Sequence, residues 1–419
     1  MKVLWFVNVP MPSVCTRLNR PVPAAGGWLA SLLEAMSEVE GLELCVVSLD
    51  DSPRAAGLAP AVFVSGGVHF MHLSVCRTAT QALADRWRGG PADERVVAAC
   101  RYAIDAYNPD IVHVHGTETA VGLVQSRCVV PTLVTIQGLL SACAPAYFGP
   151  LRPRDVTRDF LSPRLLHGTT LLHAYHSTVR GARRELGILR DARWVSGRTN
   201  WDKEMTSRLA PDAHYFHADH VLRQEFRQER WTASQDATAL LVHVSTKPYK
   251  GLECTLASLA ELTARGRAVR LVIVGSSQGS AMRGLAERLA GKWSLRSRIA
   301  WTGELPAQGL AALMSNASAY VHSSHVDNSP TTLAEAQALG VPVVAASAGG
   351  VSSMIVDHST GILVPPGDSH AMAAAIAEIL DNPALAARMG HEAALDAANR
   401  HDANVVRNQT MHAYERMVS

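Results

Sequence analysis

The sequence of 419 residues has no apolar run near the roughly 20 residues that a membrane-spanning helix needs. Its seven cysteines include no Cys-x-x-Cys pair, and cysteine and histidine show no zinc-binding spacing. The formal net charge is only +2, which gives no argument for a nucleic-acid partner. No internal repeat or low-complexity segment is present. These absences favour a reduced, globular protein of the cytoplasm.

What is present indicates two folded domains. Hydrophobic residues make up 47% of the chain, and its length exceeds what one core usually supports. Strand-like and helix-like segments alternate, which predicts parallel sheets with helices on both faces. A polar run at 232–236 separates two patterned regions. We expect an amino-terminal domain, 1–232, and a carboxy-terminal domain, 237–401, with the last helix, 402–419, packing back on the first.

The most informative stretch runs from Asp327 to Asp357. Its middle predicts a short helix, 331–339, entered through capping residues Asn328 and Ser329 and ended by a glycine. Free N–H groups at such a helix start attract phosphate. Carboxylates frame the site at Asp327 and Glu335, and an acidic pair beside an anion site suits a sugar nucleotide. An ordinary capped helix of an α/β domain is the alternative.

This stretch resembles the donor-binding signature of retaining glycosyltransferases of the GT-B fold, family 4 in particular. The family pattern is Glu, seven residues, Glu, then a small-residue helix ending in Gly-x-Pro-Val-Val-Ala. Glu335 holds the second glutamate position and Gly340 begins the same tail, whereas Asp327 replaces the first glutamate. The resemblance implies two Rossmann-like, doubly wound α/β domains facing across a cleft, with the donor in the second domain and the acceptor in the first.

The resemblance also implies roles for the residues around the predicted helix. Glu335 would hold the ribose, and Asp327 would hold hydroxyls of the transferred sugar. Gly303, at the end of a predicted strand, would lie near the nucleotide base. The backbone amides expected to bind the phosphates are those of Asn328, Ser329, Thr331 and Thr332.

A lysine loop after the first strand of the second domain is the expected diphosphate clamp. Lys250 precedes a helix-opening glycine, as in the family, while Ser245 occupies the position of the family's arginine. Lys247 would supply the missing positive charge, or only one cation is used; both lysines could also be ordinary solvent residues. No Asp-x-Asp pair accompanies this site, so we expect neither a metal nor another cofactor, and stabilisation of the leaving group by preorganised charge.

In the first domain, glycines and a histidine mark strand ends. Gly26 and Gly27 stand where backbone could approach a phosphate, although a plain turn would look the same. His115 ends a predicted strand, 111–115, and matches the family's His-x-His, which faces the reacting end of the donor sugar. His113 is expected to be a satisfied core histidine.

Two further positions of the first domain are candidates with open alternatives. Gln137 stands where many relatives have histidine; it donates and accepts hydrogen bonds but does not become a cation near neutral pH. Arg198 lies in a Gly-Arg-Thr-x-Trp-Asp block that resembles one found in many bacterial family 4 enzymes. Arg198 either pairs with a phosphate or an acceptor carboxylate, or forms a structural salt bridge with Asp202.

A predicted helix at 165–189 carries three arginines, Arg180, Arg183 and Arg184. They would either touch an anionic membrane surface that bears a lipid-linked acceptor, or form a solvated helix face. The first alternative would place the protein peripherally at the inner membrane face.

The resemblance therefore predicts a metal-independent, retaining hexosyl-type transferase of polysaccharide biosynthesis. It would move a sugar from a nucleoside diphosphate sugar to a saccharide, lipid-linked glycan or small molecule. Two alternatives remain at this point: a GT-B-fold sugar-nucleotide epimerase, and a non-catalytic sugar-nucleotide-binding scaffold. The substitutions at Asp327, Gln137 and Ser245 are what make the scaffold conceivable.

Overall fold

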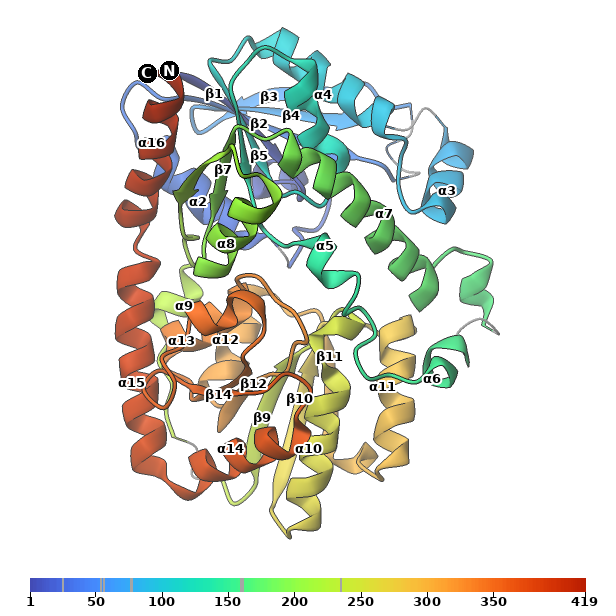
Figure 1. Ribbon diagram of the computed structural model, residues 1–419, viewed down its shortest axis with the longest axis vertical. Coiled ribbons are helices and arrows are strands. Elements are labelled where there is room, and N and C mark those ends of the chain that lie inside the picture. Colours follow the sequence, from blue (N-terminus) through green and yellow to red (C-terminus); the bar gives the residue numbers. More distant parts are fainter. Residues whose placement is uncertain (25, 53–54, 56, 76–77, 159–161, 234–235) are drawn as a thin grey trace. The chain divides into compact units, whose positions relative to one another are not determined.

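The computed structural model describes residues 1–24, 26–52, 55, 57–75, 78–158, 162–233 and 236–419. They form two compact units (Figure 1). The first contains Met1–Ala144, Leu165–Val221 and Ala403–Ser419, and the second contains Pro145–Arg164 and Leu222–Asp402. The chain enters the second unit first at Pro145 and again after Val221, ahead of the polar run at 232–236 where we expected the division. Residues 234–235 of that run lie outside the described residues.

The first unit is built on an eight-stranded sheet, counted over the described residues, in the order β3-β4-β2-β1-β5-β6-β7-β8. Only β3 pairs antiparallel, in a hairpin with β4 that turns at Gly66 and Gly67. The strands are β1 (Lys2–Val7), β2 (Glu43–Asp50), β3 (Ala61–Ser65), β4 (Val68–Ser74), β5 (Ile111–His115), β6 (Thr132–Thr135), β7 (Trp194–Gly197) and β8 (His214–His217).

Helices cover both faces of this sheet because its strands are apolar on both sides. Trp5 of β1 belongs to a core with helices α2 and α16, whereas the next residue, Phe6, packs with α4 on the other face. Trp5 Nε1 also donates to Tyr414 Oη at 2.8 Å, which fixes α16 to β1. The helices of this unit are α1 (Pro12–Arg17), α2 (Gly27–Ser37), α3 (Ala79–Arg88), α4 (Asp93–Tyr107), α5 (Leu140–Cys143), α7 (Leu171–Arg190), α8 (Asn200–Leu209) and α16 (Ala403–Val418).

The second unit has a six-stranded, wholly parallel sheet over its described residues, in the order β11-β10-β9-β12-β13-β14. Its strands are β9 (Ala239–Val244), β10 (Val269–Val274), β11 (Ile299–Gly303), β12 (Ala319–His322), β13 (Val343–Ala346) and β14 (Ile362–Val364). Its helices are α6 (Pro153–Thr157), α9 (Glu225–Gln228), α10 (Leu252–Ala264), α11 (Ala281–Lys292), α12 (Ala307–Ser315), α13 (Thr331–Leu339), α14 (Ser369–Asp381) and α15 (Pro383–Arg400).

Each sheet has a point where the direction of winding reverses. β1 lies between β2 and β5, and β9 lies between β10 and β12. Ligands of such sheets bind at the carboxyl ends of the strands beside this point. In the first unit these ends lead to Asn8 and His115; in the second they lead to the Lys250 loop and to Asp327.

Several sequence expectations need correction. Two helices, α1 and α15, were not predicted from the sequence. The cap of α13 is Pro330, and neither Asn328 nor Ser329 caps the helix with its side chain. Among the described residues, no helix is both long and apolar enough to cross a membrane.

Candidate functional site

Asp327 is the centre of a charged cluster at the carboxyl end of β12. Its Oδ2 atom lies 2.6 Å from Lys250 Nζ, 3.1 Å from His322 Nε2 and 3.1 Å from Ser324 Oγ. Burial acts to raise the pKa of Asp327, but Lys250 and His322 outweigh it and hold the pKa below its usual range. The structure therefore brings two predicted site residues, Asp327 and Lys250, into one ion pair that is charged at neutral pH.

A glycine loop fixes the backbone of Asp327. Gly350 N donates to Asp327 O at 2.9 Å. Gly349 has φ of +58°, and a Cβ added there would lie 2.2 Å from the same oxygen. Only glycine fits this position, because any side chain would push Asp327 away from Lys250.

Gly349→Ala should therefore unfold at lower denaturant than wild type, with a loss well above the roughly 1 kcal/mol that a left-handed alanine costs elsewhere. Gly266→Ala is the matched control, since Gly266 has φ of +79° with nothing within 4 Å of an added Cβ. Urea unfolding of both variants measures the difference. Equal losses in the two would show that the contact with Asp327 O carries no cost.

The start of α13 leaves hydrogen-bond donors free. Over the described residues, the N–H groups of Thr331 and Thr332 have no acceptor, and no side chain caps the helix. The side chain of Asn328 is buried at 3% exposure, and its amide oxygen and nitrogen have no partner there either. These groups form the kind of helix terminus that binds an anion.

Glu335 lies on α13 with no exposed surface, and its partner is Arg223. Arg223 Nε and Nη2 lie 2.8 and 2.7 Å from Glu335 Oε1, while Oε2 is buried without a partner among the described residues. Burial raises the pKa of Glu335, and Arg223 offsets part of that rise. Sequence analysis missed Arg223, since no local pattern links it to a glutamate so far along the chain.

The remaining predicted residues of the second unit lie at strand ends. Lys247 is exposed just before a short 3₁₀ turn, Pro248–Lys250, and makes no ion pair with a described residue. Ser245 is buried, with its hydroxyl unpartnered within the described chain. Gly303 closes β11 with φ of +68° and accepts Gly275 N at 2.7 Å.

In the first unit, two neighbouring histidines of β5 have opposite environments. His113 binds Tyr414 Oη at 2.7 Å and Thr135 Oγ1 at 2.6 Å, which confirms it as a satisfied core histidine. His115 is 3% exposed, and neither ring nitrogen has a partner among the described residues. Burial, together with His113 and Arg198, holds the pKa of His115 well below its usual range. His115 is therefore a neutral imidazole with unused hydrogen-bonding capacity.

Arg198 is a second buried group with unused donors. Its guanidinium lies 4.0 Å from the ring centre of Trp28, and Nε and Nη2 have no partner within the described residues. Burial lowers the pKa of Arg198 to about 10. The salt bridge to Asp202, one of the two alternatives, is not formed. Asp202 Oδ2 accepts the backbone N–H groups of Arg198 and Thr199 at the start of α8, and Oδ1 has no partner among the described residues. A cavity of about 10 Å³, the size of one water molecule, lies beside Arg198 and His115.

Glycine and glutamine complete this edge of the first sheet. Gly26 has φ of +80° and is the residue before α2; a Cβ there would lie 2.9 Å from Val9 Cγ2. Gly27 is the first residue of that helix. Gln137 accepts from Asn8 Nδ2 at 3.2 Å, which leaves its own amide nitrogen buried and unpartnered among the described residues.

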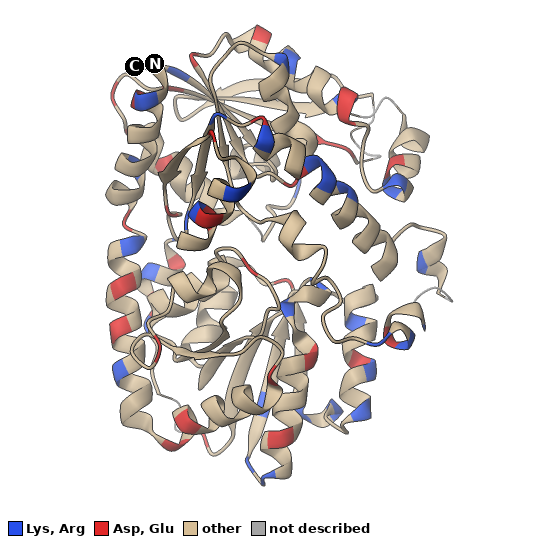
Figure 2. Ribbon diagram, in the orientation of Figure 1, with Lys and Arg blue, Asp and Glu red and all other residues tan. Residues whose placement is uncertain are grey.

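The arginines of α7, visible as a blue stretch in Figure 2, are not all exposed as predicted. Arg184 donates to Asp93 Oδ1 at 3.1 Å and to Glu118 O at 2.8 Å. Arg180 donates to carbonyls of residues 88, 90 and 91. Arg183 alone of the three is exposed, so two of the three arginines proposed for a membrane surface already have protein partners.

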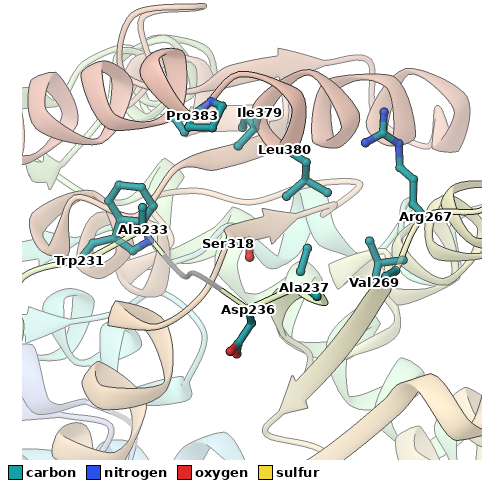
Figure 3. A pocket seen from close by; sticks show the side chains of 13 residues that line it. Trp231, Ala233, Asp236, Ala237, Arg267, Val269, Ser318, Ile379, Leu380 and Pro383 are labelled. Atoms are coloured by element: carbon teal, nitrogen blue, oxygen red, sulfur yellow. The ribbon is translucent and has the colours of Figure 1, made fainter.

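A cavity of about 350 Å³ lies elsewhere on the second unit (Figure 3). Its walls include Ala239 and Val269, at the amino ends of β9 and β10, and Pro383 of α15. It lies at the opposite strand ends from Lys250 and Asp327, so it is not part of this site.

Among the described residues, no group of three or more His, Cys, Asp or Glu side chains could hold a metal ion.

Comparison with known proteins places this geometry in context. The model of the family "Glycosyl transferases group 1" matches residues 223–396. A GDP-mannose-dependent alpha-mannosyltransferase of Mycobacterium tuberculosis is 30% identical over 295 residues, 68% of this chain and 69% of its own length. The alpha-D-kanosaminyltransferase of Streptomyces kanamyceticus is 36% identical over 145 residues, 35% of this chain and 37% of its own length. This match and several others cover less than half of the curated relative's length.

Solved structures resemble the whole chain at low identity. Sucrose-phosphate synthase from Thermosynechococcus elongatus has a TM-score of 0.72 and 18% identity, covering 100% of this chain and 99% of that one. Anabaena HepE in complex with UDP-glucose has a TM-score of 0.65 and 15% identity, covering 99% and 100%. The prediction of two Rossmann-like α/β domains of the GT-B type is confirmed.

Proposed function

This chain belongs to the glycosyl transferases group 1 family, and on that premise we propose that it transfers a sugar from a nucleoside diphosphate sugar to an acceptor hydroxyl. We also propose family 4 membership, retention of the anomeric configuration and independence from metal ions. The observation that carries the proposal is the uncapped start of α13, flanked by the Lys250–Asp327 pair and by Glu335. A cation, free amides and carboxylates together match the phosphates and hydroxyls of such a donor.

In this proposal the diphosphate binds Lys250 and the amides of Thr331 and Thr332. Phosphate oxygens compete with Asp327 for the Lys250 ammonium, and the carboxylate released in this way accepts hydroxyls of the transferred sugar. As the bond to the sugar breaks, negative charge grows on the leaving diphosphate, and fixed positive groups stabilise it. Lys247 lies in the same loop and adds charge at its exposed edge.

Glu335 takes the ribose in the same proposal. Arg223 occupies Oε1 and fixes the carboxylate, while Oε2 remains available to accept a hydroxyl hydrogen bond. A rigid acceptor of this kind costs little entropy when the donor binds. Gly303 has a left-handed backbone conformation and no side chain, which leaves room for the nucleotide base beside β11.

We propose that polar groups of the first unit bind the acceptor. His115 and Gln137 each keep a hydrogen-bonding group free at the carboxyl edge of the sheet, and Arg198 keeps two donors. Gly26 and Gly27 let backbone approach a phosphate at the start of α2. HepE, solved in complex with UDP-glucose, supports the donor class by its similarity of fold.

A panel of UDP-, GDP-, ADP- and dTDP-sugars tests this function. We expect one sugar nucleotide to bind the purified protein and to release free nucleoside diphosphate slowly, because water replaces the missing acceptor. Calorimetry measures binding, and chromatography measures release. Binding without release would indicate a protein that only holds the donor, and epimerised donor would indicate an epimerase. If none of the panel binds, the proposal is wrong.

A further inference from the structure

A buried histidine of the second unit lies beside the Lys250–Asp327 pair and has no role in the function proposed above. His322 is the last residue of β12. Its side chain is only 4% exposed, and its Nε2 atom lies 3.1 Å from Asp327 Oδ2. The distance suits an ion pair, yet the ring is poorly aligned, and Nε2 has no hydrogen-bond partner among the described residues. An unpaired buried polar atom is costly, which indicates a second state in which this nitrogen is paired.

Asp327 Oδ2 is already occupied in the free protein. Lys250 Nζ donates to it at 2.6 Å, and Ser324 Oγ donates to it at 3.1 Å. A carboxylate oxygen accepts about two strong hydrogen bonds, so these two donors leave no place for the imidazole. The other oxygen, Oδ1, accepts Asn328 N at 3.0 Å. His322 therefore bonds to Oδ2 only when Lys250 or Ser324 gives up its place.

Donor binding, as proposed above, is the event that frees this place. Phosphate oxygens draw the Lys250 ammonium away, and the carboxylate of Asp327, which is 11% exposed, is left with a charge and little water to solvate it. An imidazole beside it becomes a cation by taking one proton and restores the lost ion pair. The negative phosphates nearby favour the same cation.

The groups around His322 leave this proton uncontested. Among the described residues, the titratable groups that face the ring are Asp327, Lys250, His243 and Tyr320. Burial lowers the pKa of His243 on β9 to about 3, so that this histidine stays neutral. Burial also raises the pKa of Tyr320, whose ring centre lies 6.3 Å from that of His322, and keeps the phenol neutral. The charge of His322 is therefore set by the balance between Asp327 and Lys250.

We propose that His322 replaces Lys250 as the partner of Asp327 when the diphosphate of the donor draws the lysine away, and that the imidazole takes one proton from solvent in this exchange. His322 Nε2 then donates to Asp327 Oδ2, and the carboxylate keeps its position for the hydroxyls of the sugar. His322 is thus a positioning residue that acts through Asp327. This role rests on the proposed function, because it needs a diphosphate that competes for Lys250.

Lys250→Met tests the exchange without any donor, because the ammonium is then absent at every pH. The protonated ring pairs with Asp327 in the folded variant and has no such partner in the unfolded chain. The stability that this pair adds is present at low pH and is lost as the pH rises. Relative to wild type, the unfolding equilibrium constant of Lys250→Met should be about tenfold larger at pH 8 than at pH 6. Urea unfolding at both pH values measures it, and adding His322→Gln should remove the pH dependence.

Calorimetry with the donor found in the panel tests the exchange on binding. Heats of binding in HEPES and in Tris at pH 7 give the number of protons taken up, because the two buffers have different ionisation enthalpies. Wild type should take up about half a proton more than His322→Gln. Burial raises the pKa of Glu335 to about 7, and its contribution is the same in both proteins, so the difference isolates His322. His370→Gln, at an exposed histidine that pairs with Glu261, is the matched control and should equal wild type.

A second variant keeps the exchange testable even where His322→Gln does not fold. Asp327→Asn removes the carboxylate that attracts the proton, so it should show the same reduced proton uptake. Equal uptake in wild type and these variants, or a stability loss in Lys250→Met that does not depend on pH, would overturn the exchange and leave the proposed function standing. A wild type that binds no sugar nucleotide would overturn the proposed function, and with it the exchange on donor binding.

Discussion

Lys250→Met should lower kcat/KM by about 10³-fold, because it removes the ammonium group paired with Asp327 beside the amides of α13. The loss should fall mainly on kcat, since charge on the leaving diphosphate grows only as the sugar bond breaks. Steady-state kinetics with the donor identified in the panel, and with water or an active acceptor, measures it. A variant that keeps kcat/KM within threefold of wild type would show that Lys250 does not touch the diphosphate.

The same substitution should also destabilise the fold, and a second change separates the two effects. Without Lys250 the buried carboxylate of Asp327 loses its ammonium partner and keeps only the contacts with His322 and Ser324 described above. Breaking a buried ion pair in this way costs about 3–5 kcal/mol in other proteins. Asp327→Asn in the Lys250→Met background removes that charge and should recover most of the stability. Turnover should stay low in the double variant. If the double variant recovered turnover as well as stability, the role of Lys250 would be structural.

Arg223→Met is expected to have the next largest effect, and one that depends on pH. Glu335 has no exposed surface, and Arg223 is the group that favours its charged form. A folded carboxyl group with a raised pKa keeps a proton that the unfolded chain has released, so rising pH favours unfolding. At pH 5, where Glu335 carries its proton with or without Arg223, the variant should lose little. At pH 8 the loss should approach about 3–5 kcal/mol.

Chemical unfolding of Arg223→Met at pH 5, 6, 7 and 8 measures this difference. Arg227→Met, at an exposed position of α9, the short helix that follows Arg223, is the matched control and should show no pH-dependent loss. Adding Glu335→Gln to Arg223→Met should remove the pH dependence of the difference. A loss that is the same at every pH would mean that Arg223 contributes packing against Phe226 rather than charge.

Local signals in the sequence were sufficient for much of the second unit. The bounds of α13 agree with the prediction, because a proline before it and Gly340 after it exclude other starts and ends. β11, an alternating strand ended by glycine, was predicted equally well. The predicted cap of α13 was wrong, because Pro330 occupies the cap position in place of Asn328 or Ser329. Proline has no side-chain oxygen that could accept from the first N–H groups of the helix, so these groups stay free.

Pairings over long distances could not be predicted. Nothing near Arg223 indicates that it belongs to the second unit or that its partner is Glu335, and the polar run at 232–236 suggested a later division. The space that the Glu118 carboxylate occupies depends on glycines that follow two different strands. Contacts of this kind arise only when the sheet forms, so composition and periodicity do not predict them.

The connection of the chain to its two units has a consequence for synthesis. The chain passes from one unit to the other after residues 144, 164, 221 and 402. Tyr414, which accepts from Trp5 and contacts His113, comes after every strand of both sheets. A nascent chain on the ribosome therefore carries an incomplete first unit for as long as the second unit is being translated: α2 already covers part of one apolar sheet face, and the part that α16 covers is still exposed. Chaperone binding during translation should concentrate on that face, and release should follow the appearance of α16.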